Sequence, residues 1–117
     1  MKKIYHLGTC DTCRKIIKSL PDIEGFTLQD IKKEPFTVAE LEKLHELAGS
    51  YEALFSRRAT LYKERGLKDK TLTEADYKNL LLEHYTFLSR PVIVLGDTVF
   101  VGNSPKTVQA AIEEMGK

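Results

Sequence analysis

Residues 3–20 read KIYHLGTCDTCRKIIKSL, and both cysteines of the chain, Cys10 and Cys13, lie within this stretch. Its first part predicts a strand over residues 2–7, and its second part predicts a helix over residues 10–20 with Thr9 as the N-cap. The N-terminal end of a helix presents unpaired backbone N–H groups and the positive end of the helix dipole. This environment favours a thiolate, so we expect the pKa of Cys10 to lie below the value of about 8.5 for a free cysteine.

A strand, a Cys-x-x-Cys pair and a helix in this order are typical of a thioredoxin-like redox motif. A structural zinc site is the first alternative, but it needs four ligands. The remaining candidates lack ligand-like spacing, so no metal site is expected; they are His6, His45 and His84. Two buried structural thiols are the second alternative. The residues around the cysteines are polar rather than apolar, which favours redox chemistry over burial.

The composition describes a globular domain without a strong electrostatic field. The 117 residues fit one domain, with 42% hydrophobic and 30% charged residues. The net charge of +1 argues against direct binding of nucleic acid or of a membrane surface. We find no signal-peptide pattern and no apolar run near the roughly 20 residues of a membrane helix. Two cysteines in Cys-x-x-Cys form and no export signal indicate a cytoplasmic protein.

The pattern of hydrophobic residues changes twice along the chain. Residues 26–31 predict a second strand, which completes a βαβ unit with a right-handed crossover. Residues 33–87 are mostly helical, with capping boxes that begin at Thr37 and Thr73 and with Gly49 and Gly66 as helix terminators. Residues 91–95 and 98–101 then predict an antiparallel hairpin around Gly96-Asp97, followed by a last helix from Ser104-Pro105.

The order βαβ, helical block, ββα predicts an α/β protein with a thioredoxin-like fold and a mixed four-stranded sheet. We expect residues 1–117 to form a single domain that carries an inserted helical subdomain. The sheet half consists of residues 1–32 and 88–117, and the helical insertion of residues 33–87.

Several short segments, taken in their order and spacing, carry a resemblance to a known family. They are Tyr5-His6 before Cys10, the stretch from Cys10 to Lys15, Ser56-Arg57-Arg58-Ala59 with Tyr62 shortly after, and the stretch from Ser89 to Val94. Together they resemble the family that holds the glutaredoxin-linked arsenate reductases (ArsC), the Spx-type transcriptional regulators and their YffB-like relatives. The resemblance extends from Ile4 to Ile112.

The resemblance to the arsenate reductases implies that Cys10 is the nucleophile that attacks arsenate. Helix N–H groups and arginines would neutralise the oxyanion. The matching arginines are Arg58 and Arg90, with Arg57 as an alternative to Arg58 in the register. Arg14, one turn into the helix, is counted with them. His6 is implied to help Cys10 ionise, and Pro91 is implied to be a cis proline beside the reactive cysteine.

Two departures from the reductases leave the function open. The third oxyanion arginine of the reductases has no match in residues 101–106, where Asn103 or Lys106 would have to substitute. The reductases also generally lack a second cysteine at the position of Cys13. That cysteine resembles the Spx regulators, whose cysteine pair is a redox switch and which bind the C-terminal domain of the RNA polymerase α subunit.

Two functions from different classes therefore follow. The first is a thiol-dependent oxidoreductase without a bound cofactor, in which the Cys10 thiolate attacks an oxyanion such as arsenate, or a disulfide. Either Cys13, which would leave a Cys10–Cys13 disulfide, or external glutathione resolves the intermediate. Glutathione with glutaredoxin, or thioredoxin, would be its external reductant and partner. The alternative is an Spx-type regulator in which the same disulfide alters a binding surface for RNA polymerase.

Overall fold

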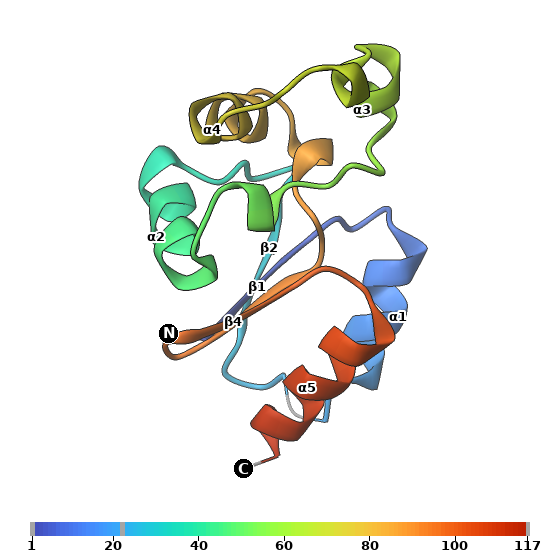
Figure 1. Cartoon of the computed structure of the whole chain (residues 1–117). Helices are drawn as coiled ribbons and strands as arrows, with labels where there is room; N and C mark the ends of the chain where they lie inside the picture. The colour runs from blue at the N-terminus through green and yellow to red at the C-terminus, as the bar shows by residue number, and fades with distance from the viewer. Residues whose placement is uncertain (1, 22, 117) are drawn as a thin grey trace. The chain divides into compact units, whose positions relative to one another are not determined.

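The computed structural model describes residues 2–21 and 23–116, which form two compact units (Figure 1). The first unit comprises residues 1–35 and 90–117, and the second comprises residues 36–89. From the sequence, these boundaries were predicted between residues 32 and 33 and between residues 87 and 88. Within the described ranges, no helix is long and apolar enough to cross a membrane.

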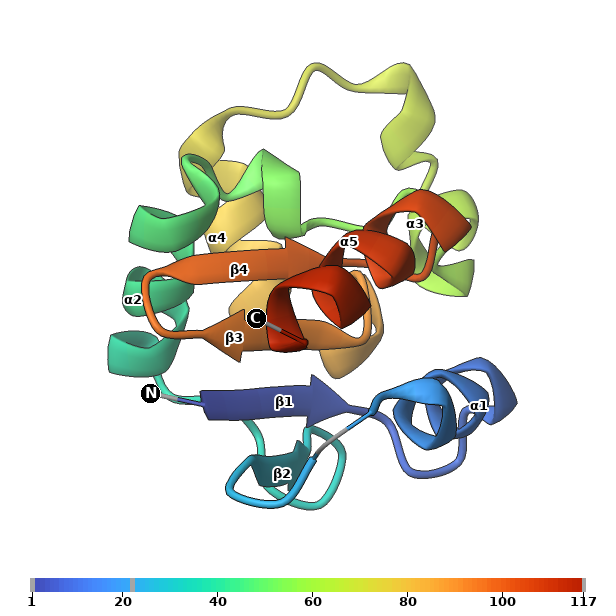
Figure 2. The same cartoon turned by 90° about the horizontal axis from the view of Figure 1, so that it is seen from below.

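The first unit contains a four-stranded mixed sheet in the order β2-β1-β3-β4. Its strands are β1 (Lys2–His6), β2 (Thr27–Asp30), β3 (Val92–Leu95) and β4 (Thr98–Val101). β1 runs parallel to β2 and antiparallel to β3, and β3 pairs antiparallel with β4 (Figure 2). The prediction of a thioredoxin-like fold with a mixed sheet is therefore confirmed.

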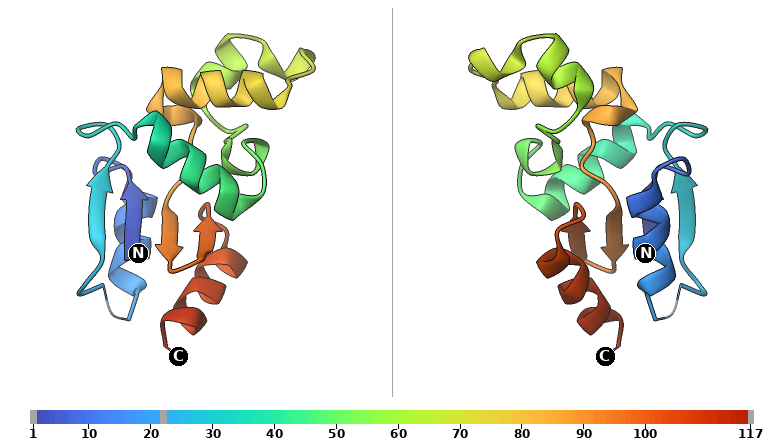
Figure 3. Two further views of the ribbon diagram at one scale, coloured as in Figure 1. Left: turned by 90° about the vertical axis from the view of Figure 1, so that its left-hand side faces the viewer. Right: turned by 90° about the vertical axis from the view of Figure 1, so that its right-hand side faces the viewer.

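Two helices, α1 (Asp11–Ser19) and α5 (Pro105–Met115), pack against the same face of this sheet (Figure 3). Ile4 and Ile93 lie opposite each other in neighbouring strands and are 0% and 2% exposed. They form one cluster with Leu20 and Ala111, and further apolar residues of both helices pack around it. Each such aliphatic side chain contributes about 1.5–3 kcal/mol on burial, so the cluster fixes α1, and with it the cysteines, to the sheet.

The start of α1 differs from the prediction. Thr9 was expected to be the N-cap, but the helix begins at Asp11 and Cys10 is the N-cap, in an extended backbone conformation with φ −88° and ψ 115°. The prediction was wrong because residues 7–10 form a turn, closed by a hydrogen bond from the Cys10 N–H to the Leu7 carbonyl oxygen at 3.0 Å. The turn moves the helix start by one residue. The thiol of Cys10 therefore lies at the cap position itself.

The second unit is helical, as predicted. It contains α2 (Val38–Ala48), α3 (Thr60–Glu64) and α4 (Glu74–Glu83), together with the 3₁₀ segments η1 (Glu52–Leu54), η2 (Leu67–Asp69) and η3 (Tyr85–Phe87). Both predicted capping boxes are present, at Thr37 with Glu40 and at Thr73 with Asp76. Gly49, which ends α2, has φ +94°, in the left-handed region where only glycine is comfortable.

Candidate active site

The two cysteines share the N-terminal turn of α1 but differ in exposure. Cys10 is partly exposed, whereas Cys13 is 0% exposed. Both are free thiols in the structure. An approaching substrate can therefore reach Cys10 first, while Cys13 lies beneath the surface of the same helical turn.

The surroundings separate the acidities of the two thiols. Burial opposes ionisation of Cys10, but the backbone N–H and thiol of Cys13, the charge of Arg90 and the backbone N–H of Thr12 outweigh it and lower the pKa of Cys10. For Cys13, burial together with the nearby Cys10 outweighs the Leu7 N–H and Arg90, and raises its pKa to about 11. Of the two thiols, Cys10 is thus the one that ionises more readily, and Cys13, with a pKa of about 11, keeps its proton at neutral pH.

The helix N-terminus acts on Cys10 through backbone N–H groups that favour its negative form. Within the described part of the chain, the Cys10 side chain accepts no capping hydrogen bond as a neutral group. The N–H groups of Thr12 and Cys13, at the second and third helical positions, nevertheless stabilise the negative sulfur. The start of α1 therefore favours ionisation of Cys10 relative to a free cysteine.

Arg90 is the positive side chain that acts on both sulfurs. It is partly buried, and its Nε atom is fully buried. The peptide bond from Arg90 to Pro91 is cis, and the Pro91 carbonyl oxygen accepts a hydrogen bond from Gly102 N–H at 3.0 Å. Arg90 lies two residues before β3, and the hydrogen bond of the intervening Pro91 ties this segment to the end of β4.

His6 ends β1, where it pairs in register with Asp30 of β2. Its charge contributes to lowering the pKa of Asp30. The groups identified as lowering the pKa of Cys10 are instead Cys13, Arg90 and Thr12. The implied role of His6 in ionising Cys10 stays a prediction.

Arg14 forms an ion pair with Asp11 on the exposed surface of α1. The two side chains are 55% and 76% exposed. Because their opposite charges lie together one turn from Cys10, they largely offset each other there. Binding of an oxyanion by Arg14 would first have to draw its guanidinium away from Asp11, and this role stays a prediction.

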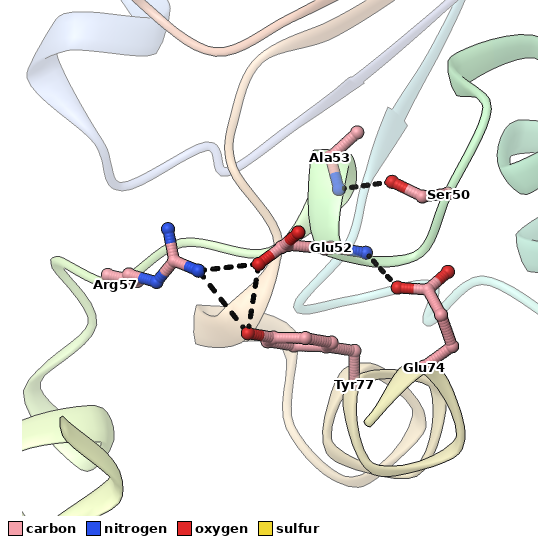
Figure 4. A network of polar contacts seen from close by, with 6 residues as sticks. All are labelled: Ser50, Glu52, Ala53, Arg57, Glu74 and Tyr77. Atoms are coloured by element: carbon pink, nitrogen blue, oxygen red, sulfur yellow. Dashed lines mark hydrogen bonds and ion pairs between the residues drawn. The ribbon is translucent and has the colours of Figure 1, made fainter. Parts of the chain in front are cut away.

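The two neighbouring arginines of the second unit have different surroundings, and the polar network around Arg57 is drawn in Figure 4. The Nη2 atom of Arg57 donates to the Glu52 carboxylate at 2.7 Å and lies 3.3 Å from the Tyr77 hydroxyl. The Tyr77 hydroxyl also donates to Glu52, at 3.2 Å. By contrast, no group in the described ranges accepts a hydrogen bond from the guanidinium of Arg58, whose backbone N–H donates to Ser56 Oγ at 3.3 Å.

The segment that carries these arginines is anchored at several points. Both oxygens of the Glu74 carboxylate accept backbone N–H groups at the start of η1, from Tyr51 at 2.7 Å and from Glu52 at 3.1 Å. The backbone of residues 54–56 pairs with that of residues 87–89 through hydrogen bonds of 2.7 and 2.8 Å. Arg57 is therefore part of a structural network, and Arg58 follows it with its guanidinium available.

The candidates for the missing third arginine lie around the start of α5. Asn103 and Lys106 are both exposed, on either side of Ser104, whose hydroxyl caps the helix through Thr107 N–H at 3.2 Å. Their role at an oxyanion stays a prediction. Among the residues that the structure describes, no group of three or more His, Cys, Asp or Glu side chains could hold a metal ion.

Comparisons with known proteins identify the family and support the fold. The sequence profile of the ArsC family matches residues 5–111. An arsenate reductase from Haemophilus influenzae is 26% identical over 109 residues, which span 90% of this chain and 93% of that protein. A solved structure of an ArsC family related protein from Bacteroides fragilis is 30% identical, with a TM-score of 0.76, and the match covers 93% of this chain and 95% of that one.

The likeness extends to solved structures of lower identity, which bear on the fold alone. An arsenate reductase from Vibrio cholerae is 23% identical and has a TM-score of 0.74, over 93% of this chain and 95% of that chain. The family match over residues 5–111 spans the cysteine turn, the helical unit and the Arg90–Pro91 segment. The chain belongs to the ArsC family.

Proposed function

We propose that this protein is a thiol-dependent oxidoreductase in which the Cys10 thiolate attacks an oxyanion, with arsenate as the substrate. The observation that carries the proposal is the lowered pKa of Cys10 at the start of α1, with Arg90 beside it. An attacking thiolate and an oxyanion repel each other, so the site needs a cation that serves both. Arg90 fits this need, and Arg58 is assigned to the oxyanion on the family resemblance.

The reaction balances with the two thiols of the chain. The Cys10 sulfur forms a bond to As(V) and displaces one arsenate oxygen, which leaves as water after protonation. The Cys13 sulfur then attacks the Cys10 sulfur, which breaks the S–As bond and leaves the electron pair on arsenic as As(III). The proton of Cys13 goes to the departing arsenic oxyacid. Two thiols have become one disulfide, and arsenate has become arsenite.

The contrast between the two cysteines orders these steps. Cys13 keeps its proton while Cys10 is a thiolate, because burial, the charge of Cys10 and their hydrogen bond raise the pKa of Cys13. Once the Cys10 sulfur is bonded to arsenic it no longer carries the thiolate charge, and the negative oxygens of the arsenate ester can take up the proton of Cys13 as its sulfur attacks. Glutathione with glutaredoxin, or thioredoxin, would then reduce the disulfide, in keeping with a cytoplasmic location.

Turnover of arsenate tests the function and the role of Cys13 together. We expect arsenate-dependent NADPH oxidation when either coupled reductant system is supplied. In Cys13→Ser, turnover with thioredoxin should fall by roughly tenfold or more, because the intermediate loses its internal resolving thiol. Glutathione can replace that thiol, so the variant should retain more activity with the glutaredoxin system. Equal rates for Cys13→Ser and the wild type with thioredoxin would exclude Cys13 as the resolver.

The two neighbouring arginines provide a matched pair of variants. Arg58→Ala should raise the KM for arsenate by about 10- to 100-fold, the value of a lost hydrogen bond to a charged group. Arg57→Ala should leave KM within about twofold and lower the free energy of unfolding by about 1 kcal/mol or less, as expected for an exposed ion pair. Steady-state kinetics and urea unfolding measure the two effects. A larger change of KM in Arg57→Ala would reverse the assignment.

The second thiol also favours a regulatory function as the alternative. In that case oxidation would close the Cys10–Cys13 disulfide, and the altered surface would bind the C-terminal domain of the RNA polymerase α subunit. Absence of arsenate turnover, together with redox-dependent capture of the purified α subunit, would favour this alternative. Turnover without such capture would favour the enzyme.

A further inference from the structure

Asp30 lies beside the turn that carries Cys10, although it is 20 residues away in the sequence. It is the last residue of β2 and pairs with His6, the last residue of β1. Its Oδ2 atom accepts a hydrogen bond from Gly8 N–H at 3.2 Å, and its Oδ1 atom accepts one from Lys32 N–H at 3.0 Å. One carboxylate therefore ties the chain after β1 to the chain after β2.

The approach of this carboxylate explains why residue 8 is a glycine. Gly8 is outside the left-handed region, so its backbone conformation is open to other residues. A Cβ atom at this position, however, would lie 2.5 Å from Asp30 Oδ2, which is closer than real Cβ contacts allow. Space for the Asp30 carboxylate, rather than backbone freedom, is what the glycine provides.

The same turn sets where the sulfur of Cys10 lies. Gly8 and Thr9 are the middle residues of the turn that the Cys10 N–H closes on the Leu7 carbonyl oxygen. The groups that favour the thiolate are the N–H groups of Thr12 and Cys13, which belong to α1, and the charge of Arg90, which lies two residues before β3. Their effect depends on distance, so it depends on how firmly the turn is held.

We propose that Asp30 is a positioning residue for Cys10: its carboxylate holds the turn of residues 7–10 through the Gly8 N–H. The inference rests on the proposed function, in which Cys10 is the reactive thiol. It adds the end of β2 to the active site, where Asp30 contacts the turn before Cys10 through the Gly8 N–H. Asp30 acts through the backbone of the turn rather than on the sulfur.

The charge of Asp30 is maintained by its neighbours. Its partial burial opposes ionisation, but the N–H groups of Lys32 and Gly8, the charge of His6 and the N–H of Lys33 lower its pKa. Asp30 is thus a carboxylate at neutral pH, and a carboxylate accepts two N–H groups at once. An asparagine has one acceptor oxygen only, so Asp30→Asn should keep one of the two hydrogen bonds and lose the other.

The test measures the pH dependence of Cys10 alkylation by iodoacetamide, with the modified cysteine identified by peptide mass spectrometry. In Asp30→Ala we expect the pKa of Cys10 to rise by about one unit, which lowers its reactivity below that pKa by up to about tenfold. Asp30→Asn should show a smaller rise. Asp97→Ala, which removes an exposed carboxylate from the β3–β4 turn, is the matched control and should leave the profile unchanged.

A double variant gives a sharper test of the contact itself. Gly8→Ala should raise the pKa of Cys10 in the wild-type background, because the new methyl group displaces the carboxylate. Added to Asp30→Ala, the same change should have little further effect, since the atom that it would meet is gone. Thermal unfolding of each variant identifies any that does not fold. If Asp30→Ala does not fold, the pKa of Cys10 is compared between the wild type and Asp30→Asn instead.

The outcomes separate the two proposals. If Cys10 of the wild type titrates like an ordinary cysteine, the proposed function fails. If Cys10 of the wild type is acidic but Asp30→Ala and Asp30→Asn leave its pKa unchanged, the positioning role of Asp30 is overturned and the proposed function stands. If Gly8→Ala changes the pKa of Cys10 equally in the wild type and in Asp30→Ala, the positioning role of Asp30 is likewise overturned.

Discussion

Replacing Cys10 by serine is expected to abolish arsenate reduction, with a loss of at least about a thousandfold in turnover. A serine hydroxyl at this position keeps its proton at neutral pH, so the N–H groups of α1 and the charge of Arg90 have no thiolate to stabilise. The measurement is arsenite formed per chain, with glutathione and glutaredoxin supplied. Arsenite formation by Cys10→Ser at a rate near that of the wild type would contradict the role of Cys10.

The Cys10→Ser variant should also change the pKa of the second thiol, Cys13. Without the Cys10 thiolate, the charge and hydrogen bond that help to raise the pKa of Cys13 are absent. The pKa of Cys13 should therefore fall from about 11, although burial keeps it above that of an exposed thiol. Its alkylation rate should accordingly rise at a lower pH in Cys10→Ser than in the wild type. Alkylation of Cys10 in the Cys13→Ser variant is measured alongside as the control, because it reports the single remaining thiol at the other position.

Replacing Arg90 by alanine is expected to have the second largest effect, a loss of about 10²- to 10³-fold in kcat. Two causes act in the same direction. The variant loses a donor to the oxyanion, and it loses a charge that lowers the pKa of Cys10. Because the thiolate is lost as pH falls through the pKa of Cys10, the acidic limb of the pH–rate profile should move to higher pH in Arg90→Ala.

Arg90→Lys separates these two causes. Lysine keeps the positive charge but lacks the planar fork that binds two oxygens at once. This variant should retain most of the lowered pKa of Cys10 while it recovers only part of the turnover. An acidic limb of the pH–rate profile that is unchanged in Arg90→Ala would show that Arg90 does not act on the thiolate.

The fold could be predicted because its signals are local. Alternating and β-branched residues mark the strands, and the capping boxes at Thr37 and Thr73 mark two helix starts within a few residues of sequence. The start of α1 was missed because the capping rule favours Thr9 for its hydroxyl. The structure instead folds residues 7–10 into a turn, so that Cys10 takes the cap position.

The site was predictable where the residues are chemically distinctive. The cysteine pair and the Arg90–Pro91 segment stand out in the sequence by residue type and spacing. Asp30 was missed, because its contact with Gly8 joins residues 22 positions apart and depends on the parallel pairing of β1 and β2. The carboxyl ends of parallel strands meet at one edge of a sheet, so an acidic residue that ends the second strand was the available signal.

The choice between Arg57 and Arg58 also lay beyond the sequence. It rests on the contact of Arg57, which lies in the turn before α3, with Tyr77, which is 20 residues away in α4. Nothing in the local sequence around Ser56 distinguishes an arginine that is held by Glu52 and Tyr77 from one whose guanidinium is available. Only the folded helical unit brings these side chains together.

A single-turnover reaction tests the central claim most directly. Reduced protein is mixed with arsenate without any added reductant, and the mass of the protein and the arsenite released are followed together. We predict one arsenite per chain and the loss of two hydrogen atoms from the protein, as Cys10 and Cys13 join in a disulfide. Cys10→Ser should yield neither product. Wild-type protein that releases no arsenite and keeps both thiols would contradict the proposed function.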